Sequence, residues 1–253
     1  MSWGDVMEPG VPLTAPSPVE SARFGRPIER LTVSASSATP LEAVCEAVAR
    51  SAADVVILRY PAEHVGWFAA LTTLGRTAVL ADSLVYWRLR TGTGRRPAPA
   101  PGLAVAGVPD PAEVRAFVGL TFAAYGNHYL ANPLFDPADA AEGYAEWALR
   151  SAARDGCVTL RDADGVLALA TTEEDGPRTE ILLAGVTPAA QGRGVYAHLL
   201  AAVEDRAAAR GAAEVVISTQ GHNTRVQRAW ARYGFEPVHT LLTVHLIRGP
   251  LPR

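Results

Sequence analysis

The chain has 253 residues, 49% of them apolar and 19% charged, a composition that supports a packed core in one large domain or two small ones. Its formal net charge of -3 at pH 7 gives no electrostatic basis for binding nucleic acid or an anionic membrane. No apolar run approaches the roughly 18 residues that span a bilayer, and no secretion signal is visible. We therefore expect a cytoplasmic protein with reduced cysteines.

The first 92 residues are predicted to form an arm and a small α/β lobe. Residues 1–26 are rich in Pro, Ser and Gly without periodicity, which predicts a flexible arm. Between 27 and 92, runs rich in β-branched residues predict strands at 31–35, 54–60 and 78–89. Helices are expected from Pro40, with Thr39 as the cap, and over 64–75. The Gly- and Pro-rich stretch 93–101 is expected to be a linker.

The second α/β unit is expected over 102–253. Strands are predicted at 103–108, three times within 157–188, at 214–220 and at 238–247, with helices at 111–122, 138–154, 191–210 and 223–235. The aromatic and amide-rich stretch 124–137 predicts an irregular loop. The run WFAALTTLG and the strand after it resemble AWARYGF and the strand after it. This resemblance has two explanations: the first lobe is a degenerate copy of the last half of the second unit, or the similarity arose by chance.

A glycine turn between a strand and a helix is the strongest sign of function. Residues 181–186 form an apolar strand, and Gln191-Gly192-Arg193-Gly194 precede the next helix. Glycines at such a turn let backbone N–H groups approach a phosphate, and the helix N-terminus favours negative charge. The dinucleotide-binding pattern is absent, because it needs a third glycine and a later acidic residue. The phosphate-binding loop of nucleotide hydrolases is excluded, since the chain contains no lysine.

These residues resemble the acyl-CoA pyrophosphate signature of the GNAT superfamily of N-acyltransferases, with Tyr196 where the signature has Gly or Ala. The resemblance implies an α/β GNAT fold with a mixed central sheet, preceded here by the smaller N-terminal α/β lobe. It also implies acetyl-CoA or another acyl-CoA as co-substrate, and no metal. The residues it implies for acyl-CoA binding are Gly185, Val186, Gln191, Gly192, Arg193, Gly194, Val195, Tyr196, Asn223 and Trp230.

Trp230 stands where the superfamily usually has a tyrosine acid that protonates the departing thiolate. An indole does not release a proton near neutral pH, so we interpret Trp230 as a packing residue of the acyl pocket. Tyr233, one helical turn further on, and Tyr196 are the candidate proton donors. General acid catalysis contributes about 10²–10⁴-fold, so loss of the usual tyrosine slows the chemistry without forbidding it.

The amine acceptor also needs a base and a binding site. Glu180 stands at the spacing of the general base in histone-acetylating members, and His128 and His222 are alternatives because imidazole titrates near neutral pH. Asn127, His128, Tyr129 and Gln220 are the residues expected to bind a polar acceptor. The resemblance implies direct attack by the amine, with the oxyanion held by backbone N–H groups near Gly185 and Val186.

The acceptor is expected to be a small-molecule amine. The stretches 127–137 and 219–224 resemble the TDP-fucosamine N-acetyltransferase group, which favours an amino sugar, and a specialised-metabolite amine is an alternative. A longer acyl-CoA or a carrier-bound aminoacyl donor also remains open, as does a catalytically silent module that binds CoA. Neither nucleic acid nor membrane is expected as a partner, and a homodimer is left open.

Overall fold

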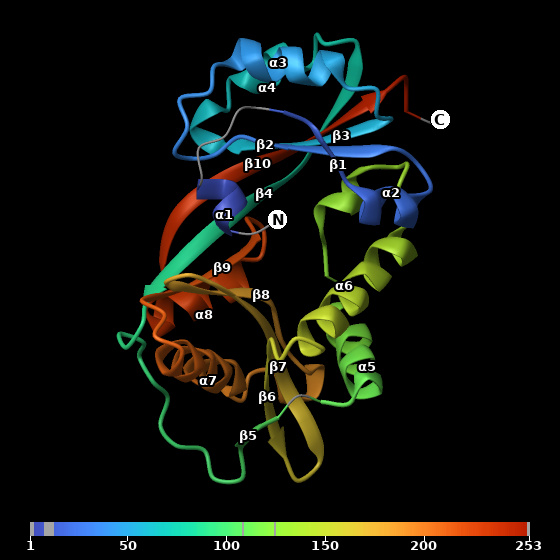
Figure 1. Ribbon diagram of the computed structural model, residues 1–253. Coiled ribbons are helices and arrows are strands. Elements are labelled where there is room, and N and C mark those ends of the chain that lie inside the picture. The colour runs from blue at the N-terminus through green and yellow to red at the C-terminus, as the bar shows by residue number, and fades with distance from the viewer. Residues whose placement is uncertain (1–2, 8–12, 108, 124, 252–253) are drawn as a thin grey trace.

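Strands from both halves of the chain form one ten-stranded mixed sheet in the order β1-β2-β3-β10-β4-β9-β8-β7-β6-β5 (Figure 1). The structure is a computed structural model that describes residues 3–7, 13–107, 109–123 and 125–251. The strands are β1 (Ala15–Pro16), β2 (Ile28–Thr32), β3 (Val55–Pro61), β4 (Arg76–Arg90), β5 (Ala104–Ala106), β6 (Cys157–Asp162), β7 (Gly165–Asp175), β8 (Arg178–Val186), β9 (Glu214–Gln220) and β10 (Glu236–Arg248). The predicted mixed α/β fold is confirmed.

Helices connect these strands and cover the sheet. The α-helices are α1 (Trp3–Met7), α2 (Pro18–Phe24), α3 (Leu41–Arg50), α4 (Trp67–Leu71), α5 (Pro111–Phe122), α6 (Pro137–Ala152), α7 (Val195–Ala209) and α8 (Thr224–Tyr233). Short 3-10 turns are η1 (Ala62–His64), η2 (His128–Ala131) and η3 (Pro188–Ala190). None of the helices within the described ranges is long and apolar enough to cross a bilayer.

Two inner strands of the sheet, β10 and β4, come from opposite halves of the chain. β10 lies antiparallel between β3 and β4, and β4 lies antiparallel between β10 and β9. The neighbouring pairs β2–β3 and β8–β9 are parallel. The segments β2–α3–β3–α4–β4 and β8–α7–β9–α8–β10 therefore have the same order of elements, and each places its last strand in the other's part of the sheet. A common origin of the two segments, and the division into domains at 93–101, stay predictions.

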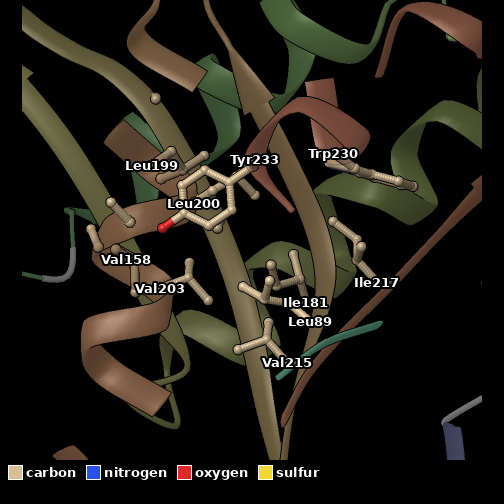
Figure 2. Packing of buried hydrophobic residues seen from close by; sticks show 14 of the residues in the cluster. Leu89, Val158, Ile181, Leu199, Leu200, Val203, Val215, Ile217, Trp230 and Tyr233 are labelled. Carbon is tan, nitrogen blue, oxygen red and sulfur yellow. The ribbon is translucent and has the colours of Figure 1, made fainter. Parts of the chain in front are cut away.

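Separate apolar clusters hold the helices on the sheet. The segments α3 and α4 pack on one face of β2, β3 and β10, and α2 and Phe135 pack on the other face. In the largest cluster, Leu199 of α7 and Trp230 and Tyr233 of α8 lie against β4, β8 and β9 (Figure 2). Full burial of such side chains stabilises the fold by about 1.5–3 kcal/mol each. The helices α5 and α6 cover β7 and β8 near Leu183.

Several local predictions differ from the structure. The segment predicted as a flexible arm contains α1, β1 and α2, and Phe24 and Glu20 of α2 are buried; residues 1–2 and 8–12 lie outside the described ranges. The helix predicted from Pro40 begins at Leu41, with Pro40 rather than Thr39 at the N-cap. The helix predicted over 64–75 is the short α4, and α7 begins only after Gly194, because η3 and the glycine turn occupy the residues before it.

Candidate active site

The strands β8 and β9 run side by side and then separate. Their parallel register joins Arg178–Ile181 only to Glu214–Ile217. Beyond that point β8 continues along β7 to Val186, and β9 continues along β4 to Gln220. The register of β8 on β7 skips Leu182, a bulge of the kind that bends a strand away from its neighbour. The backbone of both strands is therefore without a partner strand along one edge, within a gap between them.

A cavity of about 1040 Å³ includes this gap. Its wall is shared by β8, β9, α7 and α8 and by residues of α2, β2, β3, α5 and α6. Ligand sites usually have volumes of about 300–1,000 Å³, so the cavity lies at the upper end of that range. It joins the glycine turn to the N-terminal lobe.

The predicted acyl-CoA-binding residues line this cavity, with one exception. Gly185, Val186, Gln191, Gly192, Gly194, Val195, Tyr196, Asn223 and Trp230 all contribute to its wall. Arg193 does not: it is exposed and borders a separate, smaller hollow near His198.

The glycine turn presents backbone rather than side chains. Gly192 and Gly194 have φ angles of 81° and 80°, which residues with a side chain rarely adopt, and a Cβ at either would meet no atom within 4 Å. Gly194 is the N-cap of α7, and no side-chain group accepts from the first N–H groups of the helix there. The turn is thus open and carries the partial positive charge of a helix N-terminus.

Arg225 is a basic residue beside the turn that sequence reasoning missed. Its Nη1 donates to Oε1 of Gln191 at 2.9 Å, and both residues line the cavity. Arg225 lies in the first turn of α8, two residues after Asn223, and only this closeness in the sequence could have indicated it. A guanidinium here can bind a phosphate with two parallel hydrogen bonds.

Trp230 is buried, and its indole is hydrogen-bonded. Its Nε1 donates to the phenol oxygen of Tyr196 at 2.9 Å, and its ring packs edge-on against Trp87. The predicted packing role of Trp230 therefore comes with a second function, which is to orient Tyr196. Burial raises the pKa of Tyr196, a shift that the bond from Trp230 reduces. The phenol keeps its proton and is able to donate it within the cavity.

Tyr233 also reaches the cavity wall, but its hydroxyl already has a strong acceptor. It donates to Oε2 of Glu204 at 2.6 Å, and Oε1 of Glu204 accepts from the backbone N–H groups of Gly92 and Gly94. Burial raises the pKa of Tyr233, and the hydrogen bond to Glu204 raises it further. A Cβ on Gly94 would lie 2.3 Å from the Tyr233 ring. Tyr233 therefore fastens the linker to α7.

Glu180 lies outside the cavity wall. It is 5% exposed, and its Oε2 accepts from the backbone N–H of Trp3 at 2.8 Å. Its carboxylate stands at the start of α1, where a negative charge is favourable. The predicted role as general base stays a prediction, and the contact with Trp3 favours a structural role.

The predicted acceptor residues are only partly brought together. His128, Tyr129 and Gln220 line the cavity, whereas Asn127 does not: its Oδ1 accepts from the N–H of Tyr129 at 2.9 Å and caps η2. Gln220 accepts through Oε1 from the hydroxyl of Tyr125. His222 is near Gly126 and does not line the cavity.

A chain of hydrogen bonds fixes the tautomer of His128. Asn132 accepts through Oδ1 from the N–H of Leu134, so its Nδ2 donates to Nδ1 of His245 at 3.2 Å. The proton of His245 is then on Nε2, which donates to Nδ1 of His128 at 2.9 Å. Burial lowers the pKa of His245 to about 3 and that of His128 well below its usual value. His128 is therefore neutral and carries its proton on Nε2, as a donor rather than a base.

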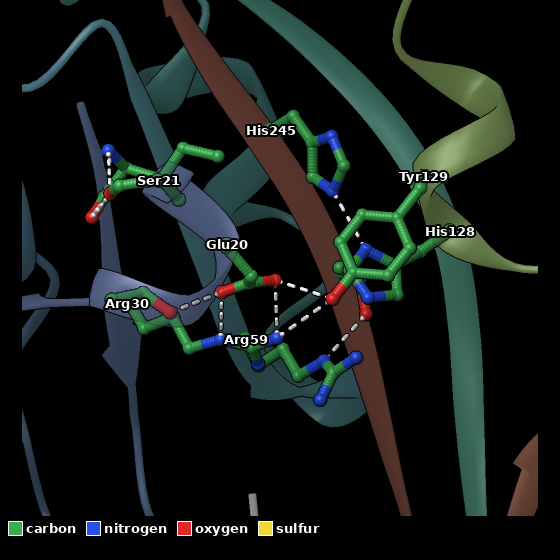
Figure 3. Close-up of polar contacts among 10 residues, drawn as sticks. Glu20, Ser21, Arg30, Arg59, His128, Tyr129 and His245 are labelled. Atoms are coloured by element: carbon green, nitrogen blue, oxygen red, sulfur yellow. Dashed lines mark hydrogen bonds and ion pairs between the residues drawn. The ribbon is translucent and has the colours of Figure 1, made fainter. Parts of the chain in front are cut away.

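Charged side chains from the N-terminal segments form the other end of the cavity. Glu20 accepts from Nε and Nη2 of Arg30 at 2.5 and 2.6 Å and from the hydroxyl of Tyr129 at 2.5 Å (Figure 3). Burial alone would raise the pKa of Glu20, but the charge of Arg30 and these bonds lower it to about 2. Arg59 is 7% exposed and donates from Nε to Thr243 at 3.1 Å. Sequence reasoning missed this cluster. Only Arg59, a charged residue within an apolar strand, could have indicated it.

Comparison with known proteins identifies the class of this site. Residues 124–235, slightly less than half of the chain, match the sequence model of the acetyltransferase (GNAT) family. This segment is a GNAT acetyltransferase domain. No curated protein matches the chain in sequence.

Solved structures show the same GNAT fold at low sequence identity. A GCN5-related N-acetyltransferase from Sphaerobacter thermophilus has a TM-score of 0.58 at 15% identity, over 78% of this chain and 61% of that one. One from Kribbella flavida has a TM-score of 0.53 at 19% identity, over 88% and 82%. A tandem GNAT protein from the clavulanic acid biosynthesis pathway has a TM-score of 0.55 at 14% identity, over 90% and 77%. The chain thus spans less than two thirds of the Sphaerobacter protein.

The GNAT family implies acyl-CoA as co-substrate, and the residues present fit it. The open turn at Gly192 and Gly194, with Arg225 beside it, suits a diphosphate. The separated edges of β8 and β9 offer backbone groups to the amides of a pantetheine arm. The glycine turn and the separated strand edges line the same cavity as the charged cluster of Glu20, Arg30 and Arg59.

Proposed function

We propose that the protein is an N-acyltransferase that moves an acyl group, most simply acetyl, from acyl-CoA to a primary amine of a small molecule by direct attack. The observation that carries the proposal is the parting of β8 and β9 above a glycine turn, within one cavity that continues to a polar end. An amino sugar or a specialised-metabolite amine are the acceptor classes that the sequence suggests.

Acyl-CoA would supply the acyl group, and its CoA portion would leave as a thiol. The turn at Gly192 and Gly194 holds the diphosphate with Arg225, and backbone N–H groups near Gly185 and Val186 stabilise the negative charge that develops on the acyl oxygen. Gly185 approaches α5 so closely that a Cβ would lie 2.6 Å from Thr121, which leaves this stretch of β8 little freedom to move.

Tyr196 is the proton donor in this proposal. Its hydroxyl accepts from Trp230 and so has its own proton available, whereas that of Tyr233 is directed to Glu204. Trp230, at the position of the usual tyrosine, then acts through Tyr196 as a positioning residue. A thiol has a pKa near 8.5, so a hydrogen bond to the departing thiolate is sufficient near neutral pH.

Calorimetric titration with acetyl-CoA, longer acyl-CoAs and free CoA tests this function. We expect micromolar binding that favours one acyl-CoA, and turnover with a primary amine. Gly194→Asp places a carboxylate and a side chain at the turn, and affinity for CoA should fall at least about tenfold. Gly211→Asp is the matched control, since Gly211 follows the other end of α7 with φ of 74° and equally open surroundings. Equal CoA affinity in both variants, or no binding of any CoA species by the native protein, contradicts the proposal.

A further inference from the structure

The cavity wall carries an excess of positive charge. Among the described lining residues there are seven arginines, Arg23, Arg30, Arg59, Arg95, Arg150, Arg225 and Arg232, and one carboxylate, that of Glu20. Arg95, Arg225 and Arg232 come from the linker and α8, and Arg225 is bonded to Gln191 beside the glycine turn. The other four come from α2, β2, β3 and α6, at the end where an acceptor would enter. Of these, Arg23 is paired with Glu146 at 2.5 Å.

Arg30 and Arg59 are held in place by the fold rather than by solvent. Arg30 is fixed by Glu20 and also donates to the hydroxyl of Tyr129 at 3.2 Å. Arg59 lies on β3, and its register partner Thr243 on β10 accepts from its Nε. Both side chains therefore have their orientation set before any ligand binds, which lowers the entropy lost on binding.

The surroundings of Arg59 disfavour its charge. Burial lowers the pKa of Arg59, and the neighbouring charge of Arg30 lowers it further, with partial compensation from Asp82, Tyr86 and Tyr129. An anion that enters the cavity beside Arg59 would relieve both effects. A planar guanidinium matches carboxylate and phosphate oxygens in geometry as well as in charge.

His128 adds a neutral donor near this guanidinium. The two side chains lie near each other in Figure 3 and both line the cavity, and the charge of Arg59 contributes to the depressed pKa of His128. The bonds from Asn132 and His245 put the His128 proton on Nε2. No described residue forms a hydrogen bond with that atom.

We propose that the acceptor amine carries an oxyanion, either a carboxylate or a phosphate, and that Arg59 binds this group with His128 as a second donor. The inference rests on the proposed function and names the substrate class of the same site. An acceptor of this kind is an amino acid or an amino phosphate, and a polyamine is disfavoured because the wall repels additional positive charge.

The same positive wall assists the chemistry. An ammonium group must release a proton to solvent before it can attack, and nearby positive charge lowers its pKa and so favours that release. An acceptor held by its oxyanion thus has its amine in a field that favours the neutral, nucleophilic form. Such a cavity depends less on a dedicated carboxylate base, in line with the position of Glu180 outside its wall.

The test uses matched acceptors with the full-length protein and the preferred acyl-CoA. Each proteinogenic amino acid is compared with its carboxamide, and aminoalkyl phosphates are compared with the corresponding amino alcohols. We expect kcat/KM for the best oxyanion-bearing amine to exceed that of its neutral partner about 10- to 100-fold, as for a charged hydrogen bond of about 1.5–3 kcal/mol. The pair that shows the preference distinguishes a carboxylate from a phosphate.

Arg59→Gln then shows whether this arginine carries the preference. KM for the oxyanion-bearing amine should rise about 10- to 100-fold, while KM for acyl-CoA stays unchanged and kcat/KM for the neutral amine changes far less. General damage to the fold would lower kcat/KM for both acceptors by the same factor. Arg59→Lys, which keeps the charge, should retain part of the preference, and Arg50→Gln on the exposed face of α3 is the control.

The outcomes separate this inference from the proposed function. If kcat/KM for the neutral amines equals that for every oxyanion-bearing partner, the inference is wrong. The proposed acyltransferase activity would still stand. A preference that survives in Arg59→Gln overturns the assignment to Arg59. Failure to bind any acyl-CoA overturns the proposed function itself.

Discussion

At the scale of single residues, the pair of Trp230 and Tyr196 shows how the usual tyrosine acid can be replaced. The indole occupies the position of the tyrosine and donates to a phenol that comes from the first turn of α7. Two departures from the GNAT signature, which look like separate defects in the sequence, are therefore joined by one hydrogen bond.

This pair predicts a specific loss of activity. Tyr196→Phe removes the proton and keeps the ring, so kcat should fall about 10²-fold or more if general acid catalysis is lost, while the dissociation constant of CoA is unchanged. Trp230→Phe should lower kcat by a smaller factor, because the phenol remains but loses its orienting donor. The measurement is steady-state kinetics beside calorimetry with CoA. Unaltered kcat in Tyr196→Phe would exclude this residue as the donor, and Tyr233→Phe is the comparison.

The buried histidines His128 and His245 predict a pH-dependent stability. The unfolded chain binds a proton at each position below about pH 6.5, whereas the folded protein keeps both neutral, His245 until about pH 3. The free energy of unfolding should therefore fall as the pH falls, with a slope that approaches about 1.4 kcal/mol per pH unit for each histidine below about pH 6. Urea denaturation between pH 7 and pH 5 measures this slope.

The control for this slope is the double variant His128→Gln and His245→Gln. Its slope should be smaller by about 2.7 kcal/mol per pH unit below pH 6. The pKa of His239 is also lowered, by burial first, but His239 is present in both proteins and cancels in the comparison. Equal slopes would show that these two side chains are charged in the folded protein.

At the scale of elements, local signals predicted the structure where the interactions are local. The helix predicted at 111–122 is observed at those residues, because Asp110 and Glu113 form a capping box and Pro111 fixes the first turn. The strand at 214–220 is likewise observed as predicted. Helix α2 was missed, since Glu20 and Phe24 are buried by partners on β2, η2 and the loop before α6, which no local pattern reveals.

The residues of the candidate site were likewise predicted where they lie close together in the sequence and missed where they do not. The glycine turn lies within one continuous stretch, so its residues were found from the sequence, and all but Arg193 line the cavity. The acceptor end draws on residues from α2 to β10, and its arginines were not predicted. The role of Glu180 depended on spacing alone, which says nothing about α1 and the contact with Trp3.

At the scale of the whole molecule, the central strands make the two halves of the chain depend on each other. β4 forms twelve register pairs with β10 and seven with β9, although it precedes the expected linker. Without β4, the backbone of β9 and one edge of β10 would have unpaired N–H and C=O groups beside the cavity. The N-terminal lobe thus completes the sheet of the GNAT domain, and it also supplies Arg30 and Arg59 to the cavity.

This dependence predicts that a fragment of residues 93–253 does not fold by itself. Loss of β4 exposes buried strand edges and the apolar side chains that pack on Trp87 and Leu89, which lie in the largest cluster. Circular dichroism and thermal denaturation of the fragment should show no cooperative transition, whereas a mixture with residues 1–92 should recover part of it. A fragment that melts cooperatively as a monomer would show that the expected linker is a true domain boundary. In that case the oxyanion preference should disappear from the fragment while CoA binding remains, because Arg59 is on the missing lobe and the glycine turn is not.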